Sequence, residues 1–214
     1  MVKKKELTTE RRIEKDLIGI FLFLGFLIAL YFITSAIFQS FNEFEYRGLS
    51  FTKERFDQLE VYRHYYFFED PESRELFRYN LYLKIDPREN TVPFEGDEIQ
   101  FKYGKTAYIG MDTSEIKHCS EGTIAVATLS GFLSDNQIPV ISGTNDFVET
   151  ALFPDFPYIT CEKYRYNSVI SIIRGEETKI VSEGNCYTIT IGPECNMVEA
   201  VEKFMVESIV HSRS

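Results

Sequence analysis

Residues 17–38 read LIGIFLFLGFLIALYFITSAIF, and none of these 22 positions has a charged side chain. At a rise of about 1.5 Å per residue, a helix of this length spans about 33 Å, enough to cross roughly 30 Å of bilayer hydrocarbon. A single apolar segment can satisfy its backbone hydrogen bonds in lipid only as a helix. The stretch therefore predicts a transmembrane helix over residues 17–38.

The residues that flank this helix indicate its orientation. The first basic residue after it is Arg47, whereas the preceding 16 residues contain six: Lys3, Lys4, Lys5, Arg11, Arg12 and Lys15. Cytoplasmic flanks are enriched in Lys and Arg, so residues 1–16 are expected to be a cytoplasmic tail. A cleaved signal peptide is the alternative, but its apolar region is shorter and ends in small residues, whereas residues 36–40 read AIFQS. We expect a retained anchor: a single-pass protein of the cell membrane with an extracytoplasmic C-terminal domain.

The composition limits the partners of that domain. The chain of 214 residues has a net charge of −10, with 17 basic and 29 acidic side chains after residue 38. Such an excess of acidic groups argues against binding to phosphate backbones. With 19 Phe and 13 Tyr the chain is too apolar to be disordered. The expected partners are therefore the lipid bilayer and a protein of unknown identity, and not nucleic acid.

The first half of the exterior is predicted to be antiparallel. Residues 39–50 are expected to form a stalk, followed by an α+β domain over residues 51–214. Residues 59–68 are rich in aromatics, residues 78–86 alternate between apolar and polar side chains, and a shorter alternation covers Ile99, Phe101 and Tyr103. Period-two alternation is typical of half-buried strands. Residues 44–104 therefore predict a small antiparallel meander.

The second half has a different pattern. Strands are expected at 107–111, 138–142 and 157–161, separated by a helix at 120–134 and by a short helix that the pair Asp146 and Glu149 opens. This order argues for parallel strands with helical crossovers. Three further strands and a C-terminal helix are predicted at 169–174, 178–182, 186–191 and 196–211, with a hairpin turn at 183–185.

Several phrases of the sequence are similar to one group of proteins. They are GLSF at 48–51, YNLYLKIDPREN at 79–90, PYITCE at 157–162 and EGNCY at 183–187. Together they resemble uncharacterised single-pass membrane proteins of archaea with small genomes. That resemblance implies a lineage over nearly the whole chain, but it supplies no activity and no catalytic residues.

All four cysteines fall in the predicted extracytoplasmic domain, where disulfides are the default. If residues 186–191 are extended, Cys186 and Cys195 lie about 20 Å apart or more, too far for a bond. Excluding Cys186–Cys195 also excludes Cys119–Cys161, because the two bonds form together. Two of the three possible pairings remain. Cys161 and Cys186 meet if the strand from Val169 folds back on the strand that ends at Cys161. We therefore favour Cys161–Cys186 with Cys119–Cys195.

The sequence contains no nucleophile elbow, no phosphate-binding loop and no spacing of metal ligands. We therefore expect no catalytic residue, no cofactor and no metal. Polar residues do follow two of the predicted parallel strands, at the sheet edge where α/β proteins bind ligands. A pocket there would be lined by Asp112, Ser114, Thr144, Asn145 and Asp146. The same residue types are common helix caps and turn residues, which is the simpler interpretation.

These features favour a membrane-anchored binding or assembly module that acts through its sheet edge or its aromatic strands, without catalysis. The alternative is an extracytoplasmic enzyme. A thiol–disulfide exchanger would use Cys119 and Cys195, each near a predicted helix N-terminus, and would need at least one free thiol. A hydrolase would use Asp112 or Asp146.

Overall fold

The computed structural model describes residues 18–35, 42–69, 74–102 and 104–212, and the chain divides into two units, residues 1–44 and 45–214. In the first unit, Ile18–Ser35 form one helix with a mean hydropathy of 2.4, and none of its side chains is buried inside the protein. This helix is long and apolar enough to cross a membrane. The predicted apolar helix is confirmed over these residues, and the remaining ends of the 17–38 stretch lie outside the described residues.

The second unit begins with a four-stranded sheet. Its strands lie in chain order: β1 (Glu43–Tyr46), β2 (Leu49–Phe56), β3 (Leu59–Glu69) and β4 (Leu76–Leu83). β2 pairs with β3, and β3 with β4, in antiparallel register. Arg47 and Gly48 connect β1 to β2 with φ values of 50° and 77°, the left-handed conformation that matches the twist of a tight hairpin. The expected meander is confirmed, but the expected stalk is wrong over residues 43–50, which are strand and turn.

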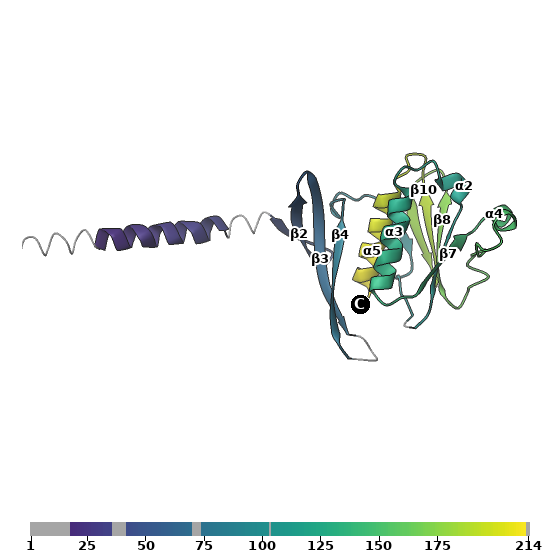
Figure 1. The fold of residues 1–214 in the computed structure, drawn as a ribbon, viewed down its shortest axis with the longest axis horizontal. Helices are drawn as coiled ribbons and strands as arrows, with labels where there is room; N and C mark the ends of the chain where they lie inside the picture. The colour runs from purple at the N-terminus through teal and green to yellow at the C-terminus, as the bar shows by residue number, and fades with distance from the viewer. Residues whose placement is uncertain (1–17, 36–41, 70–73, 103, 213–214) are drawn as a thin grey trace, which may run out of the picture. The chain divides into compact units, whose positions relative to one another are not determined.

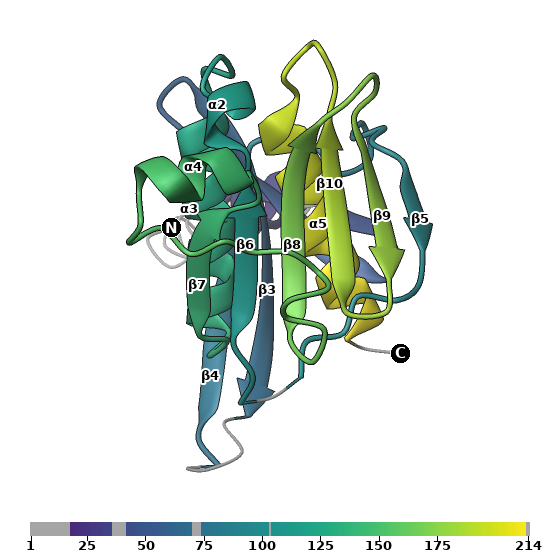
Figure 2. The same ribbon diagram turned by 90° about the vertical axis from the view of Figure 1, so that its right-hand side faces the viewer.

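A six-stranded sheet follows, with the order β5-β9-β10-β8-β6-β7. Its strands are β5 (Phe94–Gly96), β6 (Ala107–Met111), β7 (Val140–Thr144), β8 (Ser168–Arg174), β9 (Lys179–Glu183) and β10 (Cys186–Ile191). All neighbouring strands are parallel except β9 and β10, which form the predicted hairpin. Figure 2 shows this sheet face on, with β5 at one edge and β7 at the other.

Two long helices lie between the two sheets (Figure 1). They are α3 (Gly122–Asp135) and α5 (Met197–His211), close to the ranges that the apolar periodicity predicts, and they pack on each other. Two short helices, α2 (Thr113–Ile116) and α4 (Phe147–Leu152), follow β6 and β7. The core consists of the inner faces of both sheets and most of α5, including Phe51, Leu81, Tyr187, Ile189 and Phe204. The fold is α+β, as predicted.

Buried carboxylates of α5 connect the first sheet to this helix. The Glu202 carboxylate accepts hydrogen bonds from the backbone N–H groups of Lys84 (2.7 Å) and Ile85 (3.0 Å), just after β4. The Glu207 side chain is fully buried and pairs with the guanidinium of Arg47, from the first hairpin turn. These contacts satisfy polar groups that would otherwise be costly inside the protein.

Two predicted strands are wrong. Residues 157–161 lie beside the end of the edge strand β7, but they form only a single bridge there, Thr144 with Tyr158. The loop packs closely against Gly143, where a Cβ atom would overlap the carbonyl oxygen of Pro157. Residues 99–102 are not a strand either: the Ile99 and Gln100 N–H groups donate to side chains of α5 and β10.

The sequence analysis did not predict β1, β2, β5 and α2. All except β2 are three or four residues long, too short for a periodic pattern to identify them. Tyr103, the last residue of the predicted alternation, lies outside the described residues.

Candidate functional site

The structure brings together the polar residues predicted at the carboxyl edge of the parallel strands. β6 and β7 are parallel neighbours, and their ends lie side by side, with Met111 opposite Thr144. Carboxylate oxygens of Asp112, Asp146 and Glu149 lie within 4.8 Å of one another. Sequence reasoning named Glu149 only as a capping partner of Asp146. It is instead a buried member of this cluster.

Most of these side chains bind nearby backbone or hydroxyl groups. Asp112 caps α2 by accepting from the N–H groups of Ser114 (3.0 Å) and Glu115 (3.1 Å), and from the Ser114 hydroxyl (2.7 Å). Asp146 caps α4 by accepting from the Val148 N–H at 2.9 Å. These are the capping roles that the simpler interpretation of the sequence predicts.

Glu149, Thr144 and Asp146 are joined by hydrogen bonds at the end of β7, whereas Asn145 binds β8. Thr144, which is fully buried, donates to the Glu149 carboxylate (2.6 Å) and accepts from the Asp146 N–H (2.9 Å). The Asn145 side-chain amide donates to the Ser171 hydroxyl at 3.1 Å. Burial alone would raise the pKa of Glu149, but hydrogen bonds from the hydroxyls of Thr113 and Thr144 outweigh it and lower that pKa.

Three close carboxylates are also ligands that hard cations such as Ca²⁺ prefer. This cluster is the single grouping of metal-ligating side chains within the described residues. Glu149 is committed to two threonine hydroxyls, and Asp112 and Asp146 to helix caps. The hydrogen bonds therefore account for the cluster as a means of fixing two short helices to the sheet edge.

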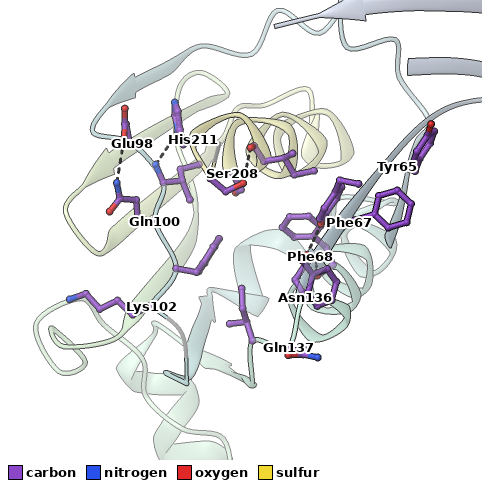
Figure 3. Close-up of a pocket in the computed structure, with 17 residues that line it drawn as sticks. Tyr65, Phe67, Phe68, Glu98, Gln100, Lys102, Asn136, Gln137, Ser208 and His211 are labelled. Carbon is purple, nitrogen blue, oxygen red and sulfur yellow. Dashed lines mark hydrogen bonds between the residues drawn. The ribbon is translucent and has the colours of Figure 1, made fainter. Parts of the chain in front are cut away.

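A larger concave site lies on the other side of the second unit, between β3 and the segment 98–102. This groove has a volume of about 1080 Å³, and Figure 3 shows Gln100 and Lys102 across it from Phe68 and Asn136. Its apolar lining comes from β3, from the segment 98–102 and from the ends of α3 and α5. Apolar members are Tyr65, Tyr66, Phe67, Phe68, Ile99, Phe101, Phe132, Ile138 and Ile209, and polar members include Glu98, Gln100, Lys102, Asn136, Gln137, Ser208 and His211.

Hydrogen bonds hold the two walls of the groove in place. On one wall, the Tyr66 hydroxyl donates to the Asn136 side-chain oxygen at 2.6 Å, which joins β3 to the end of α3. On the other wall, the Ile99 N–H donates to His211 Nδ1 at 3.0 Å. Gln100 is held on both sides of its backbone, since its N–H donates to the Tyr187 hydroxyl (3.1 Å) and that hydroxyl donates to its carbonyl (2.9 Å). The groove is therefore built from fixed elements of the fold.

The sequence analysis did not identify this groove. Its only sequence signal is the aromatic run at 65–68, which indicates core packing or, as the second explanation, a protein-contact patch. The structure gives the run two roles, because alternate residues of β3 point to opposite faces of the sheet. All four residues line the groove, but Tyr66 and Phe68 are half-buried on the inner face, whereas Tyr65 and Phe67 are exposed.

All four cysteines are in disulfides, Cys119–Cys195 and Cys161–Cys186, with Cα–Cα distances of 5.3 and 5.6 Å. The favoured pairing is confirmed, but the reason given for the second bond is wrong. Cys161 lies in the loop before β8, and the parallel pairing of β8 with β10 places that loop beside Cys186. The free thiol that disulfide exchange requires is not present in this structure.

Comparisons with models of known protein families, with curated proteins and with solved structures find no match. The resemblance to archaeal single-pass membrane proteins therefore stays a prediction.

Proposed function

We propose that this chain is a membrane-anchored, extracytoplasmic binding module, and that its groove holds a cluster of apolar side chains from a protein partner. The groove is the observation that supports this function. Its volume of about 1080 Å³ is at the upper end of small-molecule sites, its lining is aromatic and aliphatic, and its rim is polar. Protein interfaces combine a similar apolar centre, rich in aromatic residues, with a polar rim.

Two further features support the anchored, extracytoplasmic part of the proposal. The helix Ile18–Ser35 is apolar enough to span a bilayer, and the preceding tail contains the basic residues that favour a cytoplasmic N-terminus. The two disulfides fit an oxidising compartment. Protease added to intact cells should therefore digest the second unit, residues 45–214, from the outside. Cleavage only in inside-out vesicles would overturn the orientation.

Site-specific crosslinking tests the groove. A photo-crosslinking amino acid in place of Gln137, at the groove rim, should give one discrete adduct with a protein in the native membrane. Ile138→Arg, which puts a charge into the apolar lining, should abolish this adduct. The matched control is Ile141→Arg, three residues further on in β7 and outside the groove, which should leave the adduct unchanged. Equal adducts from both variants would contradict the proposed binding site.

The alternative of an extracytoplasmic enzyme stays a prediction. No specific observation favours it here, because the carboxyl-edge side chains cap helices and the cysteines are paired.

A further inference from the structure

The four-stranded sheet has an apolar face that neither long helix covers. Direct partners in an antiparallel pair point to the same side of a sheet, so the register identifies the side chains of this face. Tyr65 and Phe67 of β3 pair with Asn80 and Arg78 of β4. Tyr82 and Leu76 of β4 pair with two other odd-numbered residues of β3, which point to the same side as Tyr65 and Phe67. The pair Phe56 and Leu59, on β2 and β3, points to this side as well. We name the following six side chains the outer patch: Phe56, Leu59, Tyr65, Phe67, Leu76 and Tyr82.

The outer patch is unusually exposed for such residues. Each of the six side chains is between 47% and 66% exposed. The opposite face of the same sheet, with Phe51, His64 and Leu81, is buried against the helices. The Arg63–Glu54 ion pair lies on the same face and separates Phe56 and Leu59 from the other four residues of the patch. Groups of exposed apolar side chains on a protein surface mark sites of interaction with another protein or with a membrane.

The length of the chain limits what can cover this patch. Only residues 36–42 separate the end of the apolar helix at Ser35 from the first strand of this sheet at Glu43. Seven residues reach at most about 25 Å even when fully extended. If the helix crosses a bilayer, this sheet is therefore tethered close to the bilayer surface.

The distribution of charge favours the same arrangement. Residues 39–84, which include the four-stranded sheet, contain seven basic and nine acidic side chains, whereas residues 85–214 contain ten basic and twenty acidic. The strong negative charge thus belongs to the remainder of the domain, and the nearly neutral layer can approach anionic headgroups with little repulsion. On the patch itself, the Arg78 guanidinium lies 4.5 Å from the centroid of the Tyr65 ring. Arginine beside half-exposed aromatic rings matches the chemistry of the lipid–water interface.

We propose that the outer patch lies on the lipid–water interface of the bilayer that the N-terminal helix crosses. Tyr65, Phe67 and Tyr82 place their rings at the level of the headgroups, and Arg78 pairs with lipid phosphates. This contact fixes the orientation of the domain on the membrane and leaves the inner wall of the groove, with Tyr66, Phe68 and the segment 98–102, for a protein partner. Tyr65 and Phe67 lie where the groove meets the outer patch. The inference rests on the proposed membrane anchoring, so its test must separate the two.

The chain contains no tryptophan, so a single introduced tryptophan is a specific fluorescent reporter. Phe67→Trp places it in the outer patch, and Phe147→Trp places it on α4, beyond the second sheet (Figure 1), where the native side chain is 72% exposed. Phe23→Trp, within the apolar helix, reports insertion itself. Each full-length variant is reconstituted into phosphatidylcholine vesicles, with and without brominated acyl chains that quench tryptophan on contact.

Brominated lipid should quench the Phe67→Trp variant several-fold more than the Phe147→Trp variant, and aqueous acrylamide should quench it less. If lipid does not quench Phe23→Trp, the anchoring proposal fails. If lipid quenches Phe23→Trp but not Phe67→Trp, anchoring stands and the docking proposal is overturned. A Phe67→Trp variant shielded from both quenchers would also overturn it, because the patch would then contact protein.

Discussion

Protonation of Glu202 should make the stability of the domain depend on pH near neutrality. The side chain is 5% exposed on α5, between the helix and the end of β4. Desolvation raises its pKa from 4.5 to about 7, against the opposing effect of the hydrogen bonds from Lys84 and Ile85. The informative perturbation is Glu202→Gln, which keeps the shape and one acceptor oxygen but cannot titrate.

The sign and size follow from linkage. Between pH 4.5 and 7 the folded state holds a proton on Glu202 that the unfolded chain has released, so the free energy of unfolding falls as pH rises through this window. The full difference is about 3 kcal/mol at 1.36 kcal/mol per pKa unit, and about 2.5 kcal/mol of it falls between pH 5 and pH 8. The glutamine variant also leaves one backbone N–H without an acceptor, which costs about 1 kcal/mol at every pH.

Urea unfolding of the purified chain in detergent micelles measures this effect, with tyrosine fluorescence as the signal. The free energy of unfolding of the wild type, relative to that of the variant, should fall by about 2.5 kcal/mol between pH 5 and pH 8. Glu194→Gln, an exposed glutamate just before the same helix, is the matched control and should keep the wild-type pH profile. Parallel pH profiles for wild type and Glu202→Gln would refute the argument that burial dominates at this site.

Three further changes should alter thermal stability. Arg47→Met removes a partner of the buried Glu207 carboxylate and should lower the free energy of unfolding by about 2 kcal/mol. This is less than a fully buried ion pair would lose, because the Arg47 side chain is 42% exposed. An unchanged melting temperature would contradict this prediction. Replacing Cys119 and Cys195 together by serine opens a 76-residue loop and should lower the free energy of unfolding by about 4–5 kcal/mol. This loss should exceed that from removing Cys161–Cys186, and a larger loss from the latter would contradict the prediction. Gly143→Ala should destabilise the domain by about 1–3 kcal/mol, because the new Cβ atom meets the Pro157 carbonyl oxygen. Gly131→Ala, in open space on α3, should stabilise the domain by up to about 1 kcal/mol. Equal melting temperatures for the two variants would exclude the overlap at Gly143.

Elements with a long and regular pattern were predictable from the sequence. α3, α5 and the strands β3, β6, β8 and β10 lie within a few residues of their predicted ranges, because burial on one face imposes a period on the side chains. The strand predicted at 157–161 was wrong although its sequence suits a strand: the segment lies beside the end of the edge strand β7 and pairs with it at a single bridge. Propensity alone does not decide whether a segment extends its pairing along a neighbouring strand.

The candidate site at the carboxyl edge was also predictable only in part from the sequence. Asp112, Ser114, Thr144, Asn145 and Asp146 were predictable as one group, because parallel neighbouring strands end at one edge and short polar residues follow them. The buried position of Glu149 among these residues was not, because it depends on how α4 turns back toward the sheet edge.

The sequence by itself determined the apolar helix, the acidic character of the domain after it and the exclusion of one of the three cysteine pairings. These properties depend on composition and on distance along the chain, which the sequence contains directly. The tertiary structure decided the groove, the buried glutamates and the division of β3 into an inner and an outer aromatic face. Each of these depends on which segments, distant in sequence, are packed against one another, and that choice is made by the packing of the whole domain.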